Sequence, residues 1–193
     1  MSIPCRTSTI LVIFCALLAL TTAPALAGQS AAKTPAAEAF DDLKSLAGHW
    51  QGTSQKGKRV TIDYEVVADG SAVVERFGFV DDESGKGSTE TEDDVMLTVY
   101  HLDGEELMLT HYCMTGNQPT MRAEALGGDE VRFELSGVTN LATPEAGHMH
   151  RAVVRFQGPD RLSTAWTFRE DGEDRFTEVI DAERVTRSAA RSN

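Results

Sequence analysis

The sequence predicts an all-β fold: a single antiparallel meander of about ten strands that closes into a barrel after one short N-terminal helix. After Trp50, short stretches of alternating apolar and polar residues are separated by turn residues. The pairs Asp69-Gly70 and Asp103-Gly104, and the triplet Gly127-Gly128-Asp129, are tight hairpin signals. Because sequential hairpins leave exposed edges, a long meander usually closes into a barrel.

Residues 1–27 have the features of a secretory signal peptide. The apolar run from Ile10 to Leu20 is too short to span a bilayer, and Ala25-Leu26-Ala27 forms a small-x-small cleavage site. We therefore expect an exported protein, periplasmic or secreted after cleavage near Ala27. No second long apolar run follows, so we expect no membrane span.

The rest of the chain divides into a flexible tether, one domain and a tail. We expect the tether over residues 28–37, the barrel domain over 38–185 and a disordered tail over 186–193. Phe40, Leu43 and Leu46 have near-helical spacing, which predicts a helix over about 36–46 that plugs one end of the barrel. The ten predicted strands are 49–55, 59–67, 71–80, 94–101, 105–114, 119–126, 130–137, 148–156, 161–169 and 174–184.

Charge and cysteine content exclude a nucleic-acid binder and a domain held together by internal disulfides. The chain has 30 Asp+Glu against 18 Lys+Arg, a net charge of −12, so it lacks the basic character of a nucleic-acid binder. The acid-rich stretch 81–94 lacks calcium-loop spacing, and we interpret it as a solvated hairpin loop. After cleavage, Cys113 is the single cysteine, so no internal disulfide can form.

Period-two alternation assigns side chains to the two faces of each strand. In 130–137, Val131, Phe133 and Leu135 are expected to point inward. The two arginines in 148–156 mark the outer face. The inward face of that strand is then predicted to carry His148, His150, Ala152, Val154 and Phe156. In 105–114 we favour as inward the face with Leu107, Leu109, His111 and Cys113.

Two of these inward patterns have the spacing of metal ligands. Residues two apart on a strand share a face, so His148 and His150 can bind one metal ion, and so can His111 and Cys113. Zinc or copper would suit such a donor set, with Cys113 or the inward Glu75 as a further ligand or base. The competing interpretation is a hydrogen-bonded polar patch without metal.

Gly48-His49-Trp50, directly after the predicted helix, resembles the opening of lipocalins and related calycin barrels. The resemblance implies that Trp50 packs across the closed base of the barrel. Ten-stranded barrels of this type include fatty-acid-binding proteins and nitrobindin-like haem barrels. The Gly-x-Gly-x-Tyr-Pro segment of the nitrobindins is absent after Gly52, which makes haem less favoured than zinc or copper.

Three further motifs resemble a family of exported bacterial proteins that is described only as a domain of unknown function. They are Val-Tyr-His-Leu-Asp-Gly at 99–104, Leu-Thr-His-Tyr-Cys with Gly-Asn-Gln-Pro at 109–119, and Gly-His-Met-His at 147–150. The resemblance spans about residues 43–185. It implies a lipocalin-like fold with a shared site, and it names no activity.

Three functions are compatible with these patterns. The first is a binding protein that holds a small, largely apolar ligand; the second is a metalloprotein or metalloenzyme using His111, His148 and His150; the third is a filled barrel with a structural or interaction role. We favour binding over catalysis because no Gly-x-Ser-x-Gly elbow is present and no third group orients His111 beside Cys113. The predicted ligand-binding residues are His111, Cys113, Asn117, Gln118, Met121, His148, His150 and Trp166. Ligand identity and oligomeric state are left open.

Overall fold

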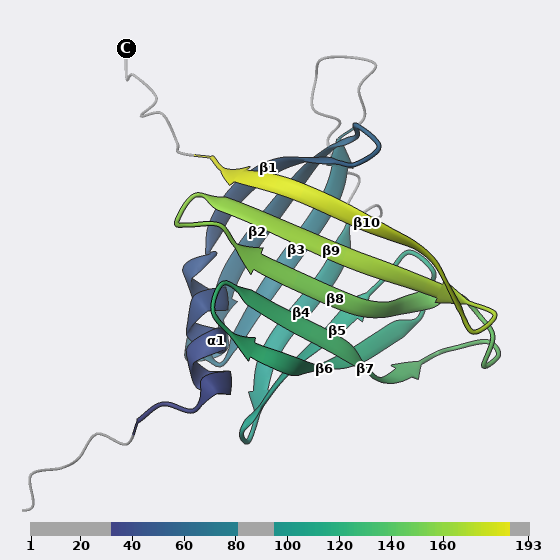
Figure 1. Ribbon diagram of the computed structural model, residues 1–193, viewed down its shortest axis with the longest axis horizontal. Coiled ribbons are helices and arrows are strands. Elements are labelled where there is room, and N and C mark those ends of the chain that lie inside the picture. Colours follow the sequence, from purple (N-terminus) through teal and green to yellow (C-terminus); the bar gives the residue numbers. More distant parts are fainter. Residues whose placement is uncertain (1–31, 81–94, 186–193) are drawn as a thin grey trace, which may run out of the picture. The chain divides into compact units, whose positions relative to one another are not determined.

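The computed structural model describes residues 32–80 and 95–185 (Figure 1). The predicted signal peptide, the acid-rich loop, the tail and the start of the tether lie outside the described residues. Within them, the chain forms one α-helix, one 3-10 turn at Ala68–Gly70 and ten strands. The elements are α1 (Pro35–Ser45), β1 (Gly48–Ser54), β2 (Arg59–Val67), β3 (Ala72–Val80), β4 (Met96–Asp103), β5 (Glu106–Tyr112), β6 (Gln118–Gly127), β7 (Glu130–Thr139), β8 (His148–Phe156), β9 (Arg161–Glu170) and β10 (Glu173–Arg184).

The ten strands form a closed antiparallel barrel, which confirms the predicted fold class. Each strand pairs with the next along the chain, and β10 pairs with β1 to complete the circle. The predicted strand ends agree with the observed ones to within two residues. The hairpin signals function as expected: Asp69 and Gly70 have φ angles of 54° and 83°, and Gly104 has φ 60°.

The helix α1 begins at Pro35, where a missing backbone N–H costs nothing, and Thr34 caps it by accepting a 3.2 Å hydrogen bond from the Ala37 N–H. Its buried face carries Ala36, Ala39, Phe40 and Leu43. The helix lies across one end of the barrel and contacts β2, β4, β5 and β6 (Figure 1). It therefore closes that end, as the spacing of its apolar residues predicted.

Trp50 and Arg184 join the beginning and the end of the domain. The Trp50 indole is buried, and its Nε1 donates a 2.8 Å hydrogen bond to the Leu46 carbonyl. The Arg184 guanidinium lies 4.3 Å from the centre of the indole and donates to the carbonyls of Ser45 and Ala47 at 2.9 and 2.7 Å. Arg184 thus satisfies carbonyl groups that the helix end leaves free.

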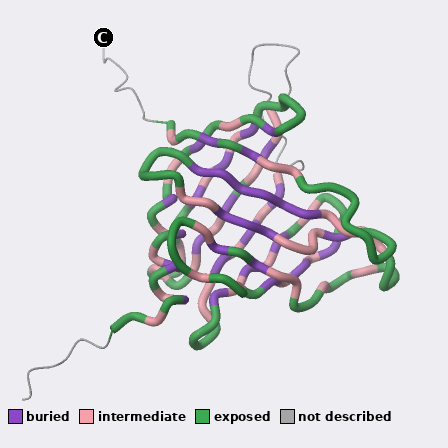
Figure 2. Tube along the Cα trace, viewed as in Figure 1, coloured by how far each residue is buried: buried purple, intermediate pink, exposed green. Residues whose placement is uncertain are grey.

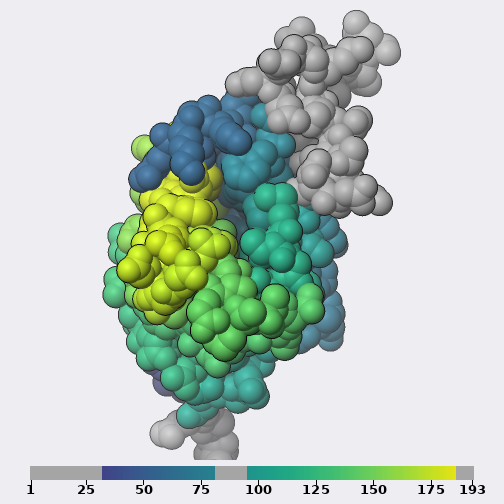
Figure 3. Space-filling model, turned by 90° about the vertical axis from the view of Figure 1, so that its right-hand side faces the viewer, coloured from purple at the N-terminus to yellow at the C-terminus, as the bar shows by residue number. Residues whose placement is uncertain are grey.

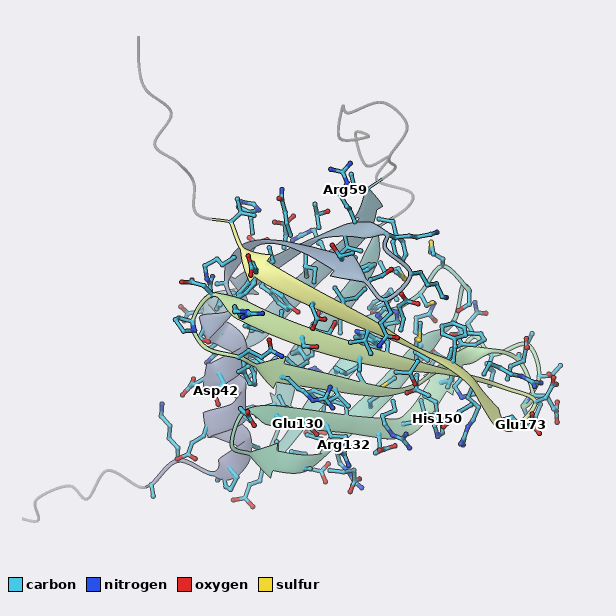
Figure 4. All side chains as sticks on the ribbon, turned by 45° about the horizontal axis from the view of Figure 1, so that its top comes forward. Asp42, Arg59, Glu130, Arg132, His150 and Glu173 are labelled. Carbon is cyan, nitrogen blue, oxygen red and sulfur yellow. The ribbon has the colours of Figure 1, made fainter. Side chains whose placement is uncertain are left out.

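The buried residues follow the strands through the barrel and the exposed ones gather at the turns (Figure 2). Val131 and Phe133 are fully buried, and Leu135 packs against them, so the predicted inner face of β7 is confirmed. Outside, the labelled side chains of Glu130 and Arg132 on β7 form an ion pair of 3.0 Å (Figure 4). Within the described residues, no helix has the length and hydropathy needed to cross a membrane.

Candidate ligand-binding cavity

A cavity of about 440 Å³ occupies the part of the barrel that faces the β1–β2 and β5–β6 turns. Figure 3 views the molecule from the right-hand side of Figure 1, and there the surface is hollowed between the yellow β10 segment and the teal middle of the chain. Its volume lies in the range typical of small-molecule sites. The lining residues are Lys56, Glu75, Phe77, Phe79, Met96, His111, Cys113, Met114, Thr115, Met149, Trp166, Phe168, Phe176, Glu178 and Ile180.

Most of this lining is aromatic or sulfur-containing. Phe77 and Phe79 meet edge to face with ring centres 5.1 Å apart, and Phe168 stacks on Phe176 at 5.2 Å. Gly147 makes room for this stack, since a Cβ there would lie 2.3 Å from Phe168 Cζ. Aromatic walls with few polar groups are typical of sites for small apolar molecules.

One wall of the barrel is polar. Tyr64 on β2 is the register partner of Glu75 on β3, Glu75 is the partner of Thr98 on β4, and Thr98 is the partner of His111 on β5. These four residues are therefore neighbours in one row across four adjacent strands, and all four are buried. We call them the polar row. Glu75 and His111 are the members of the row that line the cavity.

The Glu75 carboxyl is the acidic centre of the polar row. Its Oε2 accepts a 2.7 Å hydrogen bond from the Tyr100 hydroxyl. The buried Tyr64 hydroxyl also faces Glu75 and interacts with its carboxyl group. Burial raises the pKa of Glu75, and the interactions with the Tyr100 and Tyr64 hydroxyls oppose this effect. Burial, reinforced by Glu75, likewise raises the pKa of both tyrosines well above 10.

His111 is an uncharged imidazole in which one ring nitrogen has no hydrogen-bond partner. Its Nδ1 shares a 3.0 Å hydrogen bond with Thr98 Oγ1, and its ring lies 4.6 Å from the Trp166 ring at an angle of 35°. Burial lowers the pKa of His111 to about 4. Its Nε2 is buried and has no partner. An unpartnered buried polar atom is rare, and beside a cavity it is free to bond a ligand.

An ion pair stands on the β10 side of the cavity. Lys56 Nζ lies 3.2 Å from Glu178 Oε2 and 5.1 Å from the centre of the Phe176 ring. The side chain of Lys56 is largely exposed, whereas Glu178 is mostly covered and its Oε1 is buried without a partner. The lysine thus sits at the mouth, and the carboxylate reaches inside.

The structure corrects the prediction that His148 and His150 point into the barrel. A β-bulge between Met149 and Arg151 adds one residue to β8, so Met149 pairs with Phe168 and lines the cavity. His148 then falls opposite Arg169, whose side chain bonds Asp174 on the outer face, and His148 itself is buried without lining the cavity. The two imidazoles are neighbours, with ring centres 5.8 Å apart, but they do not meet His111 in the cavity. Figure 4 labels His150 on β8.

The other predicted site residues divide into two groups. Cys113 and Trp166 line the cavity together with His111. Asn117, Gln118 and Met121 do not: Asn117 Nδ2 donates to the Gly147 carbonyl at 2.8 Å, Gln118 Nε2 donates to the Gly116 carbonyl at 3.1 Å, and Met121 is fully buried in the core. Asn117 thereby ties the β5–β6 turn to the segment before β8.

The donor set expected for zinc or copper is not assembled. No group of three or more His, Cys, Asp or Glu residues that could hold a metal ion exists within 32–80 and 95–185. His148 Nδ1 is engaged with the Ala146 carbonyl at 2.9 Å, and burial lowers the pKa of the neighbouring His150. The convergence that the metal prediction required is thus absent from this part of the chain.

Sequence reasoning did not identify Thr98, Tyr100, Met149 and Glu178 as parts of the site. Alternation along β4 would have placed Thr98 and Tyr100 on one face with Met96, since these positions are two residues apart. Met149 could not be found by alternation because the bulge reverses its face. Glu178 lies in the polar first half of β10, where neither face is clearly apolar in sequence.

Comparison with known proteins identifies a similar fold and no family. No protein-family model matches the sequence, and a search of curated proteins finds no match. Among solved structures, Rv2717c from M. tuberculosis has a TM-score of 0.55 and 16% identity, over 77% of this chain and 98% of that one. A DUF3598 family protein of unknown function from Nostoc punctiforme PCC 73102 has a TM-score of 0.48 and 12% identity, over 74% and 49%. The structure of EF1p2_mFAP2b bound to DFHBI has a TM-score of 0.32 and 8% identity, over 76% and 99%.

Rv2717c shares the fold of this chain, and at this level of identity the likeness extends no further. The other two similarities, with TM-scores below 0.5, support no conclusion about this chain. Function must therefore be argued from the cavity.

Proposed function

We propose that this protein is an exported, lipocalin-like binding protein that holds a small, largely apolar molecule in the barrel cavity. The observation that carries the proposal is an apolar cavity of about 440 Å³ beside which the buried Nε2 of His111 has no partner. Leaving a buried polar atom unpaired costs roughly 1–3 kcal/mol, and a ligand that bonds Nε2 would remove this cost. The apolar body of the ligand would lie among Trp166, Phe168 and Met149.

The first experiment is titration of the protein with N-phenyl-1-naphthylamine, a neutral dye that fluoresces in apolar surroundings. We expect saturable binding to the wild type. Cys113→Trp fills the cavity from its lining and should weaken binding at least tenfold. Its matched control is Tyr112→Trp, since Tyr112 is the adjacent residue but its side chain is exposed outside the barrel. Equal affinity in the two variants, or no binding to the wild type, would contradict the proposal.

The second experiment identifies a natural ligand. Native mass spectrometry of protein purified without chelator or histidine tag should show an organic adduct, and solvent extraction should release it. The same spectra would show a bound zinc, copper or haem. A metal adduct that persists in His111→Phe and disappears in His148→Ala would instead favour the metal-binding alternative.

A further inference from the structure

The positive charge at the cavity lies at its mouth, whereas the carboxyl groups lie deeper. Its charged or titratable lining residues are Lys56, Glu75, Glu178, His111 and Cys113. Lys56 is exposed at the mouth and is already paired with Glu178. His111 carries no charge near neutral pH because its pKa is about 4. The described interior therefore contains carboxyl groups and no free cation.

The hydrogen-bonding groups of the interior are mainly acceptors. Glu75 uses one oxygen for the Tyr100 hydroxyl, and a carboxylate has room for further donors. Glu178 Oε1 is buried and unpartnered. His111 Nε2 is an acceptor in the tautomer whose Nδ1 donates to Thr98 Oγ1. A ligand that brings N–H donors would satisfy more of these atoms than one that brings acceptors.

A carboxylate ligand would be repelled by the acidic groups of the interior. Beside Glu75 it would place two acids in a site of low dielectric, where like charges repel strongly and one of them must take up a proton. The aromatic lining around this wall supplies no positive charge to offset that repulsion. Fatty acids and other apolar acids are therefore disfavoured although the cavity is apolar enough for their chains.

We infer that the ligand is an apolar amine, whose nitrogen is held by Glu75 and His111 while its hydrocarbon part fills the aromatic half of the cavity. This inference rests on the proposed function, because it names the ligand class of the same site. An ammonium group has three N–H donors, enough to reach both the carboxylate and the imidazole Nε2. Its charge would pair with Glu75, and a paired charge is the form in which a buried ion is tolerated.

The test is displacement of N-phenyl-1-naphthylamine by three molecules with the same chain: octylamine, octan-1-ol and octanoate. Octylamine should displace the dye at concentrations at least tenfold below those of octanoate, with octan-1-ol between them. In Glu75→Gln, which keeps an acceptor for Tyr100, the ratio of the amine and octanoate affinities should fall at least tenfold. Glu124→Gln, an equal charge change on the outer surface, should leave the ratio unchanged.

The outcomes separate the two proposals. If the dye binds but octanoate competes as well as octylamine, the amine inference is overturned and the binding function stands. A preference for octylamine that persists in full in Glu75→Gln also overturns it, because the amine would then bind the acidic surface. If neither the dye nor any of the three molecules binds, both proposals fail. Circular dichroism of each variant checks that it is folded.

Discussion

Replacing His111 with phenylalanine removes a buried, uncharged imidazole and leaves a ring of similar shape against Trp166. In the folded protein the pKa of His111 is lowered to about 4 from its ordinary value of 6.5, because burial disfavours the charged form. Between these two values the unfolded chain binds a proton at His111 that the folded chain does not. The stability due to the neutral imidazole is therefore intact above pH 6.5 and is lost as the pH falls towards 4.

The size of this loss follows from the difference between the two pKa values. At 1.36 kcal/mol per pKa unit, it is about 3 kcal/mol, which is a large part of the stability of an ordinary domain. Glu75 acts in the opposite direction, since its raised pKa gives stability that is lost as the pH rises through that value. Both proteins contain Glu75, so its contribution cancels when the wild type is compared with His111→Phe.

The assay is urea unfolding followed by circular dichroism, at several pH values from 7 to 4, for the wild type and His111→Phe. The difference in unfolding free energy, wild type minus variant, should decrease by about 3 kcal/mol over this range. A difference that stays constant would refute the reasoning, because it would mean that His111 titrates alike in the folded and unfolded chain. The absolute stability of the variant does not affect this test.

Three further predictions concern packing and fluorescence. Gly147→Ala should lower the unfolding free energy by about 1–3 kcal/mol, because the added methyl group would clash with the Phe168 ring. Adding Phe168→Leu to that variant should recover part of the loss. Urea unfolding of the single and the double variant measures both effects. Arg184→Met should cost about 2 kcal/mol in the same assay, since the helix end loses charged hydrogen bonds while the apolar stem still covers the indole of Trp50. In Trp50→Phe, the remaining indole is Trp166, and binding of the naphthylamine dye should quench its emission; unchanged emission on saturation would place the dye elsewhere.

The architecture was predictable because the hairpin turns and the strand periodicity agree with each other. Counting outward from the Asp69-Gly70 turn brings Tyr64 opposite Glu75, and counting outward from the turn after Asp103 brings Thr98 close to His111. Two of the three strand pairings in the polar row can thus be predicted from the sequence to within about one residue. The third, between Glu75 and Thr98, joins β3 to β4, which are separated in the sequence by the long acid-rich segment, so the register cannot be counted from a short turn signal.

The position of the second histidine pair was not predictable for a different reason. A β-bulge depends on how two strands fit the curvature of a closed barrel, and the alternation along β8 gives no sign of it. One extra residue reverses every side chain beyond it. Ala152 and Val154 are buried in the interior as predicted, whereas His148 and His150 do not line the cavity, because His150 is the extra residue of the bulge.

The polar row makes the cavity lopsided. Hydrogen-bonding groups lie along neighbouring strands on one side, aromatic rings line other parts of the wall, and the helix closes one end of the barrel. A molecule anchored by its polar group is therefore surrounded unequally by the polar row, the aromatic rings and the end of the barrel that the helix closes. Mirror-image forms of one ligand would place different substituents against the rings. The site should accordingly distinguish enantiomers, and a chiral molecule extracted from the protein should be enriched in one hand.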